Sequence, residues 1–158
     1  MSTTIQAEHF TGALYLLLDE TFDNVHGIFL DKGTSLFETL APISAAEASI
    51  PVGGKCATLA AQAKHIAFYL DVLEKGVRTG QFERQDWGKI WRETKEVTPD
   101  EWETIKGDLR TSYDRIKALI HDTTVWPGEQ EIGGAIATIV HTAYHLGEIR
   151  QALCTLKA

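Results

Sequence analysis

A run of residues near the C-terminus, from Ile132 to Gly147, contains no Lys, Arg, Asp or Glu. Charged side chains normally form the face that a surface helix turns toward water. A helix formed by this run lacks such a face, so we expect it to lie in a core. This expectation already favours a helical protein in which other elements surround the run.

Two histidines, His141 and His145, lie within this run at a spacing of four residues. Residues at i and i+4 project side by side from a helix, and imidazole nitrogen is a common metal ligand. The pair therefore indicates two ligands of a metal site. The alternative is a pair of core histidines, each satisfied by a hydrogen bond to a neighbour. A third ligand on another helix would favour the metal site.

The composition fits one compact domain that spans residues 1–158. The chain is 44% hydrophobic, which suits a sizeable core, and nothing in it marks a second domain. Its formal net charge is -7, from 22 acidic and 15 basic residues, and it has no basic stripe. These features argue against binding to nucleic acid or to an anionic membrane surface.

The N-terminal residues lack the basic and apolar segments of a signal peptide, and no apolar stretch is long enough to span a bilayer. We therefore expect a cytoplasmic protein. Cys56 and Cys154 are too few for a disulfide scaffold, and neither lies in a paired zinc-type spacing. We interpret both as reduced core residues.

Helical periodicity divides the chain into four long segments. The second is the clearest, because its apolar residues recur three and four positions apart. The third begins with a capping box in Thr98-Pro99-Asp100-Glu101. The predicted long helices span residues 4–31, 55–77, 98–121 and 131–157, with a short helical patch at 35–40 and a long connection at 81–97 that contains about one helical turn.

The fold class that follows is all-α, a four-helix bundle with a long connection between the second and third helices. No segment shows the alternating pattern of a strand, and no internal repeat is present. Metal sites in such bundles form in the interior, from side chains on facing helices.

His65, on the second predicted helix, is the candidate third ligand. A helical wheel places it away from the face on which the charged residues of that helix cluster, so we expect it to point inward. If the second and fourth helices are neighbours, His65, His141 and His145 converge on one divalent ion. Three imidazoles leave one or more positions open for water or a substrate.

Glu148 continues the stripe of the histidine pair by three residues. It either holds an imidazole in its metal-binding tautomer or binds the ion itself. The alternative is a salt bridge with Arg150 at a solvated helix end. The remaining histidines have weaker claims as ligands: His9 and His121 lie at helix ends, where histidines are normally solvated, and His26 lies on a partly apolar turn.

Two further groups of residues have open roles. Glu20 and Asp23, on the first predicted helix, either approach the ion or belong to a solvated face. The aromatic residues of the loops line an entrance to the site, form a dimer contact, or simply pack under the long connection. These aromatic residues are Trp87, Trp91 and Trp126.

The segment Leu59-Ala60-Ala61-Gln62-Ala63-Lys64-His65, followed by His141-x-x-x-His145-Leu146-Gly147-Glu148-Ile149-Arg150-Gln151, resembles the DinB/YfiT-like superfamily of metal-binding four-helix bundles. The resemblance covers the full chain, helix for helix, and its specific motif content is the three histidines and their flanks. It implies up-down-down-up connectivity, often a homodimer, and a nickel, zinc or similar divalent ion bound by those histidines. Many relatives carry Gln at the position of Glu148.

Relatives with assigned chemistry include thiol-dependent S-transferases and isomerases. The resemblance therefore implies a metal-dependent enzyme of thiol S-transferase or hydrolase type that acts on a small molecule. Its ion would activate a bound water or a low-molecular-weight thiol cosubstrate. One alternative is a non-catalytic metal-binding or stress-related interaction module. Another is a helical bundle whose histidines are buried, neutral and free of metal.

Overall fold

The computed structural model describes residues 5–54 and 56–156, and in this part of the chain all regular secondary structure is helical, with no β-strand. The all-α class predicted from the sequence is therefore confirmed. Seven α-helices and one short 3-10 helix follow one another as α1 (Ala7–Phe22), α2 (Leu36–Leu40), α3 (Ala45–Ala48), η1 (Val52–Gly54), α4 (Leu59–Thr79), α5 (Gly88–Glu93), α6 (Pro99–His121) and α7 (Glu129–Leu156).

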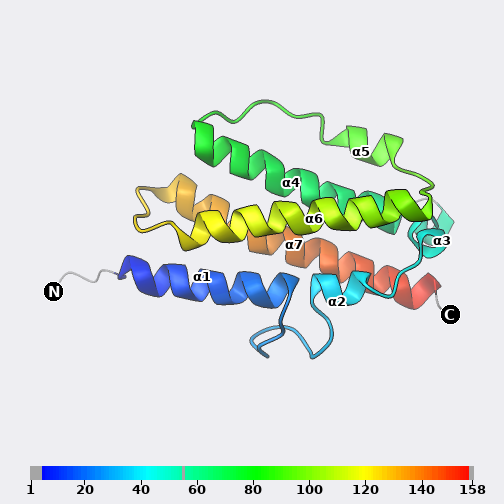
Figure 1. The fold of residues 1–158 in the computed structure, drawn as a ribbon, viewed down its shortest axis with the longest axis horizontal. Coiled ribbons are helices and arrows are strands. Elements are labelled where there is room, and N and C mark those ends of the chain that lie inside the picture. The colour runs from blue at the N-terminus through cyan, green and yellow to red at the C-terminus, as the bar shows by residue number, and fades with distance from the viewer. Residues whose placement is uncertain (1–4, 55, 157–158) are drawn as a thin grey trace.

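Four of these helices are long, and they lie side by side with α1 and α7 running in one direction and α4 and α6 in the other (Figure 1). α4 packs against both α6 and α7, and α1 packs against the same two helices. The connection from α4 to α6 crosses the length of the bundle and contains α5, the single helical turn expected there (Figure 1).

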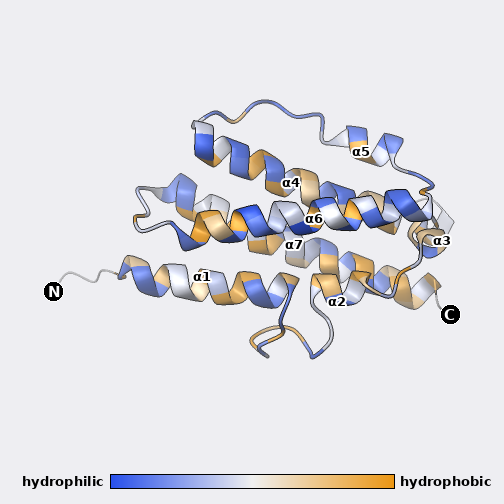
Figure 2. Ribbon diagram, in the orientation of Figure 1, coloured by the Kyte–Doolittle hydropathy of each residue, from blue (hydrophilic) through white to orange (hydrophobic). Residues whose placement is uncertain are grey.

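The core lies between the four long helices, each of which alternates apolar and polar residues along its length (Figure 2). Phe22 of α1 stacks on Tyr113 of α6 with ring centroids 4.4 Å apart. Trp102 is fully buried and donates its indole N–H to the carbonyl oxygen of Ile43 at 2.7 Å. The short helices before α4 are thereby attached to the bundle.

Local signals fix the ends of two long helices as the sequence predicts. Thr98 caps α6 by accepting a hydrogen bond from the backbone N–H of Glu101, while the Glu101 carboxylate accepts from the backbone N–H of Thr98. α4 ends at Gly80, whose φ of 68° places it in the left-handed region that favours glycine. The helix begins at Leu59, because Thr58 caps it by accepting a hydrogen bond from the backbone N–H of Ala61. The predicted start at Lys55 is therefore four residues too early, and Lys55 itself lies outside the described residues.

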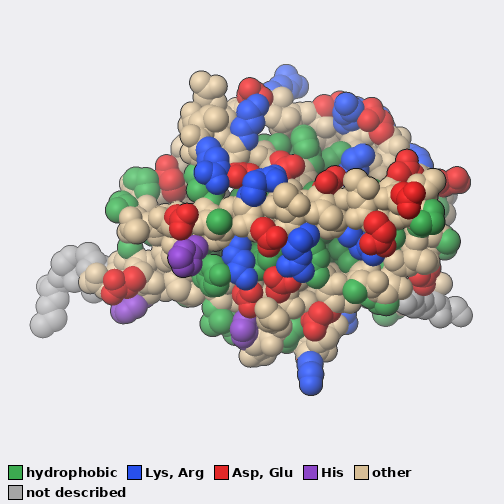
Figure 3. Space-filling view, viewed as in Figure 1, with side chains coloured by type: hydrophobic (Ala, Val, Ile, Leu, Met, Phe, Trp, Pro, Cys, Tyr) green, Lys and Arg blue, Asp and Glu red, His purple; other side chains and the backbone are tan. Residues whose placement is uncertain are grey.

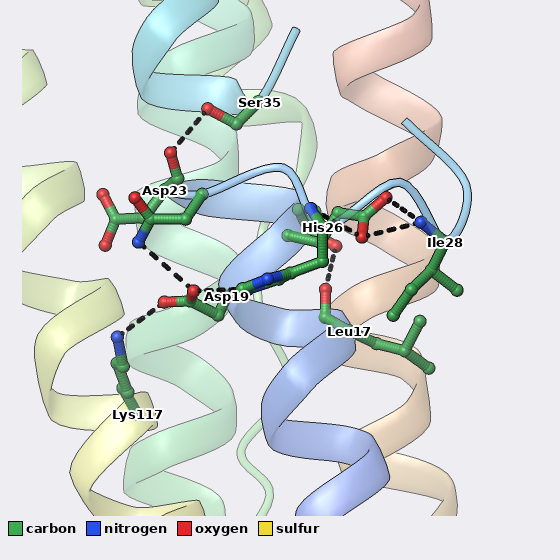
Figure 4. Close-up of polar contacts among 10 residues, drawn as sticks. Leu17, Asp19, Asp23, His26, Ile28, Ser35 and Lys117 are labelled. Atoms are coloured by element: carbon green, nitrogen blue, oxygen red, sulfur yellow. Dashed lines mark hydrogen bonds and ion pairs between the residues drawn. The ribbon is translucent and has the colours of Figure 1, made fainter. Parts of the chain in front are cut away.

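The first helix is shorter than predicted, because it ends at Phe22 and the chain then turns back as a loop. The buried carboxylate of Glu20 accepts hydrogen bonds from the backbone N–H groups of His26, Ile28, Phe29 and Leu30, at 2.7 to 3.1 Å. Figure 4 shows His26 and Ile28 of this loop beside the end of α1. These contacts hold the amides in the loop, where a continuing helix would have paired them with carbonyl groups one turn earlier.

Two predictions of burial are wrong. The last helix, α7, exposes 61% of Val140 and 62% of Tyr144, so the uncharged run does not lie wholly in the core. No other described element covers that side of α7, and uncharged residues therefore face outward. Cys56 and Cys154 are free thiols but exposed, because Cys56 precedes α4 in an irregular segment and Cys154 lies on the outer side of α7.

Surface charge is mixed. Figure 3 shows basic and acidic side chains intermingled over the face on which α6 lies in front, and many are paired there, including Arg115 with Asp71 and Glu74. Among the described residues, no helix combines the length and the apolar character needed to cross a membrane.

Candidate metal centre

The three predicted histidines come together between α4 and α7. His65 projects from α4, and His141 and His145 project from α7, on the sides that these antiparallel helices turn toward each other. A hydrogen bond of 3.1 Å from the side-chain amide of Gln62 to the carboxylate of Glu148 joins the same two helices one turn away. This contact aligns α4 with α7 and so sets His65 opposite the histidine pair.

The Nε2 atoms of the three rings point at one another. His141 Nε2 lies 3.1 Å from His65 Nε2 and 3.2 Å from His145 Nε2. A ring nitrogen carries either one proton or one lone pair in its plane, so His141 Nε2 cannot form ordinary linear hydrogen bonds with both neighbours. A cation among the three atoms would satisfy all three lone pairs at once.

The spacing of these nitrogens also fits a single divalent ion. With metal–nitrogen bonds of roughly 2.0–2.1 Å, nitrogens separated by 3.1 to 3.2 Å subtend an angle of about 100° at the metal. This angle lies between the tetrahedral and octahedral values. Three ligands on one side of an ion leave the opposite side open, because no described carboxylate or thiol completes the group.

Burial keeps the three imidazoles neutral. His65 and His145 are 7% and 6% exposed, and His141 is half-buried. Loss of water lowers the pKa of His65 to about 4 and that of His141 to about 4, with a further contribution from the positive charge that His145 carries when protonated. Burial also lowers the pKa of His145, although Glu148 opposes this effect. Near neutral pH, all three rings therefore have a lone pair to offer.

Gln62 and Glu148 orient the His145 ring. On the side of the ring opposite Nε2, the Gln62 side-chain carbonyl oxygen lies 2.5 Å from His145 Nδ1 and the Glu148 carboxylate lies 3.0 Å from it. A proton on Nδ1 is donated there, which leaves the Nε2 lone pair facing the other two histidines. The Tyr144 hydroxyl donates to the other carboxylate oxygen at 2.7 Å. Of the two readings of Glu148, the contacts favour the orienting role, since Arg150 instead contacts the Thr39 hydroxyl.

Burial alone would raise the pKa of Glu148, but hydrogen bonds from Tyr144 and Gln62 and the neighbouring His145 hold it below its usual range. The carboxylate is therefore charged near neutral pH. It lies behind His145 and can strengthen that ring as a ligand by stabilising its protonated Nδ1.

Aromatic packing positions the other two rings. The buried Nδ1 atoms of His65 and His141 have no hydrogen-bond partner among the described residues. Instead, Trp91 packs on the His65 ring with centroids 4.4 Å apart, and Tyr69 stacks on the His141 ring at 3.7 Å. Trp87 lies against Tyr69 and His65. The rings are therefore fixed by apolar surfaces, which also keep water away from them.

The remaining candidates lie elsewhere. Trp126 packs edge-on against Phe10 and donates to the Thr11 hydroxyl, so it does not belong to the group around the histidines. Glu20 is occupied by the loop after α1, and Asp23 pairs with Arg110. The other histidines contact none of the three candidate ligands. His26 pairs with Asp19, and His121 pairs with Asp122 at the exposed end of α6. His9 is exposed on the first turn of α1.

Three residues around the histidines were not assigned roles from the sequence, namely Gln62, Tyr69 and Tyr144. Each lies three or four residues from a candidate ligand or from Glu148, which places it on the same side of its helix. That spacing was the signal available to find them. Spacing alone does not distinguish a residue that supports the site from one that packs in the core. That distinction depends on which side chains the facing helix places opposite it.

Comparison with known proteins adds no relative. A scan against protein-family models, a search of curated proteins and a search of solved structures each returned no match for this chain.

Proposed function

We propose that this protein binds a divalent metal ion, nickel or zinc, through Nε2 of His65, His141 and His145. The observation that carries the proposal is the approach of three neutral ring nitrogens to 3.1 and 3.2 Å, with one nitrogen shared between two contacts. Buried histidines that merely satisfy one another would form a pair and leave no third ring aimed at the same point.

We also propose a DinB-like arrangement of the four long helices, up-down-down-up, with the homodimer that this resemblance implies. Two features support it. The paired directions of α1 with α7 and of α4 with α6 require a long link between the second and third long helices, and the chain supplies one between Thr79 and Pro99 (Figure 1). The histidines lie on the second and fourth of these helices.

The activity that fits such a centre is a metal-dependent reaction of a small molecule, of thiol S-transferase or hydrolase type. A bound divalent ion would lower the pKa of a water or of a low-molecular-weight thiol at its open side. The chain contributes three neutral ligands and a carboxylate that holds His145 in the ligating tautomer. Trp87 and Trp91 shield His65 from solvent and thereby favour the neutral ring.

A second candidate is a non-catalytic metal-binding or stress-related interaction module. The arrangement of the histidines favours this candidate, because one comes from α4 and two come from α7. A bound ion would add a further link between these helices to the contacts of Gln62 with Glu148 and His145. In that case the ion contributes mainly to stability. The two candidates share the site and differ in turnover.

The first experiment measures the metal content of untagged protein by plasma mass spectrometry after loading with Zn²⁺ or Ni²⁺ and gel filtration. We expect about one ion per chain for wild type, and close to none for His141→Ala, because the shared nitrogen is lost. His121→Ala is the matched control, since this histidine is exposed at the end of α6 and should leave the metal content unchanged. Full metal content in His141→Ala would refute the site.

The second experiment separates the two candidates. Metal-loaded wild type and His141→Ala are assayed with panels of thiol acceptors and hydrolysable esters and amides. Turnover by wild type that His141→Ala lacks supports the enzyme. Binding of the ion without any turnover, combined with a large loss of thermal stability on chelation, supports the interaction module.

A further inference from the structure

An apolar cavity of about 670 Å³ lies between the C-terminal part of α4, the end of α6 and the N-terminal part of α7. Its volume falls within the range of small-molecule sites. Most of its lining is aliphatic or aromatic, and the lining side chains of α4 and α6 include Leu73, Val77, Ile116, Leu119 and Ile120. Neither this cavity nor a larger one of about 870 Å³ between α4, α5 and α6 is lined by any of the three histidines.

The cavity and the histidines nevertheless lie along the same two helices. On α7, the lining residues Gly134 and Thr138 precede His141 by seven and three residues, so they lie on the same side of the helix as His141. On α4, the lining residue Leu73 follows Tyr69 by one turn, and Tyr69 stacks on the His141 ring. Along α4, this one aromatic ring stands between the apolar cavity and the ligands.

The segment after α4 covers both places. Phe82 lines the cavity and lies directly over Gly76, where an added Cβ would come within 2.2 Å of its ring. The Phe82 side chain is 63% exposed, so it covers the cavity from the solvent side. A few residues later, Trp87 packs on Tyr69 and His65. One connection therefore shields the cavity and the histidines in succession.

We propose that the ligand of the metal centre is an amphipathic small molecule with a polar, metal-binding head at the histidines and an unbranched apolar tail in this cavity. The inference rests on the proposed metal site and names the class of molecule that it takes. The cavity lining from Leu73 to Gly80 spans about 10 Å of α4 at roughly 1.5 Å per residue. The lining begins eight residues after His65, about 12 Å along α4, so a tail of about eight carbons that starts at the histidines brings its far end into the near part of the cavity, at Leu73.

Alkyl hydroxamates test this proposal, because one head group that chelates Zn²⁺ can be combined with tails of different length. Acetohydroxamate and octanohydroxamate are titrated by calorimetry into untagged, zinc-loaded protein. Each methylene moved from water into an apolar site tightens binding about fourfold. We therefore expect octanohydroxamate, which has six more methylenes, to bind wild type at least ~100-fold more tightly than acetohydroxamate.

Two adjacent glycines provide a matched pair of variants. An added Cβ meets no atom within 4 Å at either Gly133 or Gly134, and both lie inside α7 with ordinary helical φ. Gly134 lines the cavity, whereas Gly133 is exposed on the outer side of α7. Gly134→Leu should fill the cavity and reduce the gain from the longer tail to less than ~10-fold. Gly133→Leu should keep the full gain, and both variants should bind acetohydroxamate as wild type does.

The outcomes separate this inference from the proposed metal site. If acetohydroxamate binds and the longer tail adds nothing, the cavity is not a tail site and the metal site stands. If Gly134→Leu keeps the full gain, the tail lies elsewhere and the inference is wrong. If zinc itself does not bind to wild type, the proposed function fails, and this inference fails with it.

Discussion

The carboxylate of Glu20 should be the strongest single polar contribution to the stability of the N-terminal part of the bundle. Its two oxygens accept hydrogen bonds from four backbone amides, those of His26, Ile28, Phe29 and Leu30. Burial alone would raise the pKa of this group, but the amides outweigh burial and lower the pKa to about 2. We therefore expect Glu20→Gln to destabilise the protein although it keeps the shape of the side chain.

The magnitude follows from the hydrogen bonds. Glutamine has one carbonyl oxygen, which can retain the amides of Ile28, Phe29 and Leu30, while its NH₂ group faces the donor of His26. A hydrogen bond to a charged group contributes roughly 1 kcal/mol more than one between neutral groups. Weakening three bonds by this amount and losing a fourth, which contributes roughly 2 kcal/mol, should cost about 5 kcal/mol of unfolding free energy.

The assay is urea unfolding followed by circular dichroism at pH 7 and at steps down to pH 3. The folded pKa of about 2 lies below the ordinary value of 4.5, so the stabilisation is fully present above about pH 5 and is lost as the pH falls toward 2. Wild type should therefore lose stability over this range more steeply than Glu20→Gln. Glu8→Gln, on the exposed first turn of α1, is the control and should change stability by less than ~0.5 kcal/mol. Equal stability of wild type and Glu20→Gln at pH 7 would refute the reasoning.

Two further predictions concern the metal centre. Glu148→Ala removes the charged acceptor at His145 Nδ1 and the group that binds the Gln62 amide, while the Gln62 carbonyl oxygen can still accept from Nδ1. Zn²⁺ binding should therefore weaken roughly 10-fold in a competitive chelator titration. Glu148→Gln should be less affected because an amide oxygen can still accept, and unchanged affinity in the Ala variant would contradict the orienting role. A metal concentration of 100 times the dissociation constant stabilises the folded protein by about 2.7 kcal/mol. Chelation should therefore lower the melting temperature of wild type by about 5–10 °C and leave that of His141→Ala unchanged. An equal shift in both proteins would mean that the chelator acts elsewhere, and would contradict the prediction.

The elements that the sequence predicts well are those whose signals are local. The capping box at Thr98 and the periodicity of α4 involve residues within a few positions of one another, and the structure places both as expected. The inward direction of His65 follows in the same way from the charged face of its own helix. The meeting of His65 with the pair on α7 required only that two such helices pack side by side.

The sequence-based predictions fail where the local structure depends on residues that are distant in the sequence. The end of α1 depends on Glu20 binding amides up to ten residues later, a contact that the helical pattern through Val25 and Ile28 does not reveal. The roles of Gln62 and Tyr69 depend on what α7 places opposite them. Propensity and spacing describe one helix at a time, and the partner of each side chain is a property of the packed bundle.

The uncharged run in α7 acquires a different explanation once its exposure is known. Burial accounts for the buried Thr138 and Thr142 but not for Val140 and Tyr144, which face outward beside His141. A lysine at such a position would place a positive charge near the proposed ion and would repel it. The same uncharged surroundings desolvate the histidines and keep their lone pairs free of protons. The lack of charge along this helix therefore suits the binding of a cation at the three histidines as well as the packing of the bundle.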